Sequence, residues 1–112
     1  MASFLENIEK LNFPKVPPPT IPAPVREVAL RLGLTLTLTS PSVPEQYELL
    51  RSGTPSGYIR VRHGEMSITY PDARDEDLYD GAVEGFGGFT DHEREAKLLF
   101  ALGLIAARMM RA

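Results

Sequence analysis

The densest group of chemically versatile side chains lies in the segment GYIRVRHGEMSITYP, residues 57–71. Arg60, Arg62, His63 and Glu65 fall within six positions of one another. Arginine guanidinium groups bind anions, and a histidine with a positioned partner can act as a general base. The same four residues also fit the solvated face of a β-hairpin.

The alternation of apolar and polar residues favours the hairpin. Residues 57–63 and 65–70 are predicted strands, joined by a two-residue turn at His63 and Gly64. Histidine tolerates a positive φ better than most residues, which suits this position. The turn would set Arg62 opposite Glu65 and would align the apolar residues of the two strands.

The preceding predicted strand, residues 46–52, can be registered by the same test. Pairing Leu49 with Ile59 aligns apolar residues and sets Glu48 against Arg60. The outer face would then be a ladder of opposite charges, which suits register and solubility more than catalysis.

Nucleic-acid binding is an alternative use of this strand face. A basic and aromatic surface could stack bases and contact phosphates, and its residues would be Arg51, Tyr58, Arg60 and Arg62. The neighbouring Glu48 and Glu65 oppose that use, as does a net charge of −3 with a pI near 5.3. We therefore expect no nucleic-acid partner.

An acidic loop over residues 72–84 offers another chemistry. Its carboxylates could bind a divalent metal in an enzyme, and the candidate ligands are Asp72, Asp75, Asp77 and Asp80. Their spacing does not fit an EF-hand, and a solvated loop is the simpler interpretation. No Ser-His-Asp or His-Glu spacing connects His63 or His92 to a catalytic partner. The sequence predicts no catalytic residue and no cofactor.

Composition narrows the class of protein further. The chain has 112 residues and no cysteine, which excludes disulfides, cysteine zinc sites and thiol nucleophiles. Neither a secretory signal nor a membrane span is apparent, because the longest apolar run, residues 98–107, is too short to cross a bilayer. A cytoplasmic location is the resulting expectation.

Two regions are expected, an N-terminal arm over residues 1–24 and one domain over residues 25–112. The arm combines a short helix over residues 3–12 with six prolines between residues 13 and 24. The domain starts with a helix over residues 25–32, ended by Gly33. The alternating segment LTLTLT, residues 34–39, is the first predicted strand, and another edge strand is expected near residues 78–83.

The predicted fold class is α+β, a mostly antiparallel meander of four or five strands with helices packed on one face. The longest helix begins with a capping box at Thr90 and Glu93 and runs to about Met110. Its core-facing residues would join strand residues in a core comprising Leu34, Leu36, Leu38, Tyr47, Leu49, Ile59, Val61, Met66, Ile68, Leu98, Leu102 and Ile105.

The long C-terminal helix is apolar nearly all round, and one small sheet can cover only one of its sides. We therefore expect a non-enzymatic interaction module, a small adaptor or accessory subunit that contacts another protein or a second copy of itself. The predicted contact residues lie in the arm and on this helix, and they are Phe13, Val16, Pro17, Ile21, Leu99, Phe100, Leu104 and Met110. Enclosure of the helix by the rest of the domain is the competing interpretation.

Overall fold

The computed structural model describes residues 19–40 and 44–111. The predicted helix over residues 3–12 and most of the proline-rich arm lie outside this part of the chain. The elements are α2 (Ala23–Arg31), β1 (Thr35–Ser40), β2 (Glu45–Arg51), β3 (Thr54–Arg62), β4 (Glu65–Tyr70), β5 (Glu76–Ala82) and α3 (Asp91–Met110). No helix in the two described ranges has both the length and the hydropathy needed to cross a bilayer.

The five strands form one antiparallel sheet in the order β1-β2-β3-β4-β5. Two of its hairpins close with two-residue turns in which both residues have positive φ, Ser52-Gly53 (50° and 80°) and His63-Gly64 (54° and 77°). Turns of this kind match the right-handed twist of the flanking strands. The α+β class, the meander and the fifth strand are confirmed, although β5 starts earlier than the predicted edge strand.

The β3/β4 register is confirmed, with Arg62 opposite Glu65 and Ile59 opposite Ile68. The predicted β2/β3 register is wrong by two residues, because Ile59 lies opposite Tyr47 instead of Leu49. The short Ser52-Gly53 turn and a bulge in β3 set this pairing. A slip of two residues leaves every side chain on its own face, so the apolar alternation could not detect the error.

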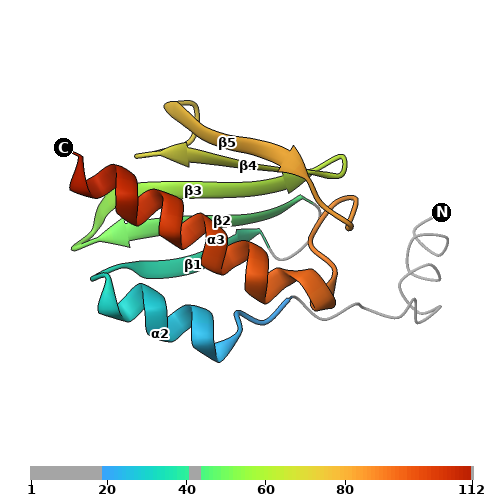
Figure 1. Cartoon of the computed structure of the whole chain (residues 1–112), viewed down its shortest axis with the longest axis horizontal. Coiled ribbons are helices and arrows are strands. Elements are labelled where there is room, and N and C mark those ends of the chain that lie inside the picture. The colour runs from blue at the N-terminus through green and yellow to red at the C-terminus, as the bar shows by residue number, and fades with distance from the viewer. Residues whose placement is uncertain (1–18, 41–43, 112) are drawn as a thin grey trace, which may run out of the picture.

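Both described helices lie on one face of the sheet, where α3 runs diagonally across the strands and α2 lies beside β1 (Figure 1). The predicted stop at Gly33 is present with a φ of 74°, and Thr90 and Glu93 form the predicted capping box. The predicted core residues are buried except Leu36 and Leu38, which are half-buried against it. Val25, Ala29, Phe89 and Ala101 complete the core.

Candidate functional site

The outward side of α3 carries two of the four large apolar residues that are exposed in the described part of the chain, and the other two are Leu30 on α2 and Phe86 in the segment before α3. Leu98, Ala101, Leu102 and Ile105 face the sheet and are buried, while Phe100 is 44% exposed and Met110 is 87% exposed. Leu99 and Leu104 are half-buried. These last four residues, together with the exposed small residues Ala96, Gly103 and Ala107, are called the α3 outer face below.

The four larger residues of the α3 outer face form two pairs, Leu99 with Met110 and Phe100 with Leu104, one on each side of its small residues. Phe100 and Leu104 are four residues apart and share one side of the helix, where the Phe100 ring meets Tyr79 of β5 edge to face, with centroids 4.9 Å apart. No atom lies within 4 Å of the position that a Cβ on Gly103 would occupy. The small residues between the two pairs therefore leave room for another surface to approach the helix closely.

The predicted contact residues are only partly brought together. The four on α3 lie along one helix. Ile21 instead packs half-buried against the core, which fixes where the chain enters the domain. Phe13, Val16 and Pro17 lie outside the described residues.

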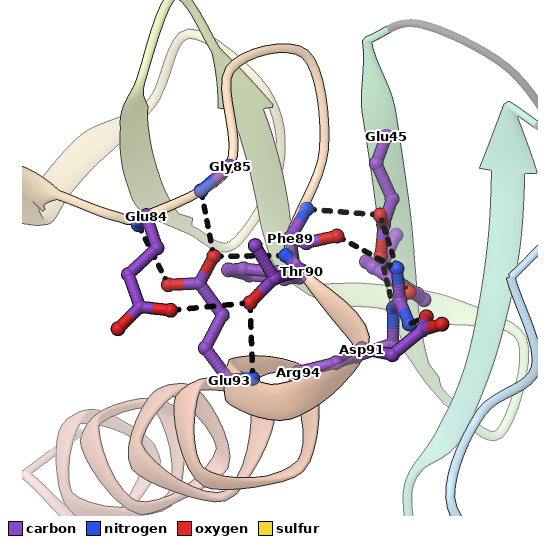
Figure 2. Close-up of polar contacts among 9 residues, drawn as sticks. Glu45, Glu84, Gly85, Phe89, Thr90, Asp91, Glu93 and Arg94 are labelled. Atoms are coloured by element: carbon purple, nitrogen blue, oxygen red, sulfur yellow. Dashed lines mark hydrogen bonds and ion pairs between the residues drawn. The ribbon is translucent and has the colours of Figure 1, made fainter.

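A buried ionic cluster joins β2 to the start of α3 and was not predicted from the sequence (Figure 2). Glu45 is 3% exposed and Arg94 is 7% exposed. Arg94 Nε donates to Glu45 Oε2 at 2.9 Å, and its Nη2 donates to Glu45 Oε1 at 3.1 Å. The Tyr47 hydroxyl donates to Glu45 Oε2, and the Phe89 N–H donates to Oε1 at 3.1 Å.

Every member of this cluster is hydrogen-bonded to other groups of the fold. Both carboxylate oxygens of Glu45 are occupied, and Arg94 is also bonded to the Asp91 carboxylate and the Phe89 carbonyl. Burial and the hydrogen bond to Glu45 raise the pKa of Tyr47, and hydrogen bonding to Glu45 raises the pKa of Arg94. Neither group exchanges a proton near neutral pH.

Glu93 forms a second clamp at the same end of α3. Its carboxylate accepts the backbone N–H groups of Glu84 (2.9 Å), Gly85 (2.8 Å) and Thr90 (2.9 Å), as Figure 2 shows. The glycine-rich segment before α3 is thereby tied to the helix by an acidic side chain. A carboxylate in this position leaves the helix start unsuited to a phosphate.

The helix-free face of the sheet forms a solvent-open groove of about 730 Å³. The groove crosses β2 to β5 and reaches the turn before β5, and it is lined by Gln46, Tyr58, Arg60, Arg62, His63, Glu65, Ser67, Thr69, Ala73, Arg74, Asp77 and Asp80. Three arginines thus share it with three carboxylates. Of the predicted nucleic-acid residues, Arg51 lies outside this lining, next to the Ser52-Gly53 turn.

The predicted ladder of ion pairs on this face is absent from the described residues. The observed register sets Arg60 opposite Gln46 and Ser67, and Glu48 opposite Tyr58. Arg62 does lie opposite Glu65, but neither Arg60 nor Arg62 has a carboxylate oxygen within 4.0 Å among the described residues. Both guanidinium groups are therefore available in the groove.

The four acidic candidates for a metal do not converge. Asp77 and Asp80 line the groove, whereas Asp72 and Asp75 accept backbone hydrogen bonds within their own turn, from Ala73 N and Asp72 N. In residues 19–40 and 44–111, no three histidine, aspartate or glutamate side chains gather as metal ligands.

The histidines are likewise apart from each other. His63 lies at its turn with its ring edge to face with Phe86, at 5.6 Å between centroids, and His92 is exposed in the first turn of α3.

Comparison of the chain with family models, with curated proteins and with solved structures found no match.

Proposed function

We propose that the protein is a non-enzymatic interaction module, a small adaptor or accessory subunit, whose α3 outer face and proline-rich arm contact a partner protein or a second copy of the chain. The exposure of large apolar side chains on α3 carries this proposal. Fully burying one such side chain contributes roughly 1.5–3 kcal/mol, so Phe100 and Met110 represent a substantial driving force for association.

The arrangement of the outer face supports contact with another ordered element. The two pairs of larger side chains lie on either side of the small residues Ala96, Gly103 and Ala107. This shape can receive a helix or a strand edge. Arg108 also connects this helix to the sheet. Its Nε donates to Glu76 Oε2 of β5 at 2.9 Å, and its guanidinium lies over the Tyr70 ring of β4. A rigid surface loses less conformational entropy on binding.

The polar clusters of the described residues support a binding role over a catalytic one. The buried groups Glu45, Arg94 and Glu93 are engaged in holding the fold, and neither histidine has an acidic partner within 4.0 Å among the described residues. In the described residues, no three histidine, aspartate or glutamate side chains gather as metal ligands, so the geometry gives the metal-dependent alternative no support.

A photo-crosslinking residue at position 100 or 110 tests the proposal in the native cell. We expect both positions to give the same covalent adduct, identifiable by mass spectrometry, and we expect position 92 on the exposed first turn of the same helix to give none. The proposal is overturned if positions 100 and 110 give no adduct and the purified chain sediments as a monomer at every concentration.

A further inference from the structure

We propose that the groove on the helix-free face is a second binding surface, which takes a polypeptide segment in polyproline II geometry that carries an acidic and a basic side chain three residues apart. It lies on the opposite side of the sheet from the α3 outer face. The two surfaces can therefore be tested separately.

The strand register arranges the groove into two rows of side chains that run across the sheet. The first row contains Gln46, Arg60, Ser67 and Asp80. The second row contains Tyr58, Thr69 and Asp77, and Glu48 lies opposite Tyr58 on β2, outside the groove lining. Each row has a hydroxyl on β4 and ends in a carboxylate on β5, and the first row has a cation on β3.

The spacing of the opposite charges sets the length of the ligand. Neighbouring strands lie about 4.8 Å apart, so two strand spacings separate the backbones of Arg60 and Asp80 by about 10 Å. A segment in polyproline II geometry has three residues per turn and advances about 3.1 Å per residue, so side chains three residues apart lie on the same side and span nearly the same distance. An acidic group over Arg60 and a basic group over Asp80 would each meet an available partner of opposite sign.

The middle of the groove offers hydrogen bonds to a peptide backbone. The half-buried Ser67 lies between the basic and the acidic strand and lines the groove, so its hydroxyl can donate to or accept from a ligand backbone there. Every peptide unit brings one donor and one acceptor, which a short charged molecule lacks. A polypeptide therefore fits the groove better than a single ion.

The charge balance of the lining also selects against a polyanion. Arg60, Arg62 and Arg74 attract phosphate groups, but Glu65, Asp77 and Asp80 repel them over the same area. A ligand with both signs of charge gains from both sides of the groove. Nucleic acid gains only from one side.

Binding is tested by NMR titration of the full-length chain with the peptide acetyl-Gly-Glu-Gly-Gly-Lys-Gly-amide. We expect the shifted backbone amides to lie in β3, β4 and β5, and a peptide with glutamine in place of both charged residues to shift them less. Arg60→Gln and Asp80→Asn should each weaken binding about two- to five-fold, the range for exposed ion pairs. Arg26→Gln and Glu27→Gln, exposed on α2, are charge-matched controls that should leave binding unchanged.

The sign of the Asp80→Asn effect separates the possible occupants. A polypeptide with both charges binds this variant more weakly, whereas an anion such as inorganic phosphate binds it more tightly. Tighter binding of the peptide to Asp80→Asn, or no shift in the groove amides at millimolar peptide, overturns the proposal. Circular dichroism of each variant shows that the fold is retained.

Discussion

At the scale of single residues, the least predictable feature is the pairing of Glu45 with Arg94. The two lie 49 positions apart, and neither belongs to a motif. A usable signal was nevertheless present, since Glu45 alternates with the core residues Tyr47 and Leu49 and therefore faces the apolar side of its strand. A carboxylate on that side requires a buried cation or donor, but the sequence does not say which one.

Replacing Glu45 with Gln should unfold the protein more easily. The substitution leaves the Arg94 cation buried without its principal counter-ion, and loss of one member of a buried pair costs about 3–5 kcal/mol. Urea denaturation followed by circular dichroism measures the change in the free energy of unfolding. Glu48→Gln on the open face of the same strand is the control and should change stability by less than about 0.5 kcal/mol. Equal stability of the two variants would show that the pair is dispensable.

Glu93 should make stability depend on pH in the acid range. Burial alone would raise its pKa, but the backbone hydrogen bonds from Thr90, Glu84 and Gly85 outweigh burial and hold the pKa below the usual value of 4.5. On acidification, Glu93 therefore binds its proton at a higher pH in the unfolded chain than in the folded chain. The stabilisation from Glu93 is present above its usual pKa and is lost as the pH falls through the folded-state pKa.

The measurement is the urea midpoint between pH 3 and 7 for the wild type and for Glu93→Gln. We expect the variant to be less stable at pH 7 and to lose less stability on acidification than the wild type. Parallel curves for the two proteins would contradict the assignment.

At the scale of elements, most of the fold could be predicted from local patterns. The alternating strands, the His63-Gly64 turn and the capping box at Thr90 each depend on residues close together in the chain. The β2/β3 register could not be predicted, because two competing pairings both align apolar residues. Only the length of the Ser52-Gly53 turn and the bulge in β3 choose between them.

Substitution by alanine should change the stability of the protein in opposite directions at two glycines, Gly57 and Gly103. A Cβ on Gly57, whose φ is 152°, would lie 2.7 Å from Ile105 Cδ1, so Gly57→Ala should push α3 from the sheet and cost about 1–3 kcal/mol. Gly103 lies in α3 with open space around it, so Gly103→Ala should stabilise the helix by roughly 0.5–1 kcal/mol. Thermal unfolding of both variants tests the pair, and a stabilising Gly57→Ala would refute this account of the helix–sheet contact.

At the scale of the whole molecule, the sheet separates two surfaces of different character. The apolar nature of α3 was predictable from composition, and its exposed residues follow once one side is known to face the sheet. The groove was not predictable, because its rows combine four strands whose relative alignment depends on the β2/β3 register. Arg60 and Arg62 were identified as candidates, but the sequence did not predict that they would lack ion-pair partners among the described residues.

The two surfaces should act independently. A variant with Phe100→Ser and Met110→Ser changes only the helix side, and sites separated by more than about 10 Å without shared partners usually behave additively. We therefore expect its affinity for the Glu/Lys peptide to equal that of the wild type in the same NMR titration. A several-fold change would show that the sheet transmits an effect from one side to the other.

The neighbour-by-neighbour order of the meander also bears on how the chain acquires its fold. Each strand pairs with the strand synthesised just before it, so hairpins can form successively with short loops to close. Arg94 comes late in the chain and needs Glu45 already in place. We therefore expect the buried ionic cluster of Glu45 and Arg94 to form last during synthesis, when α3 packs onto a sheet that is already assembled.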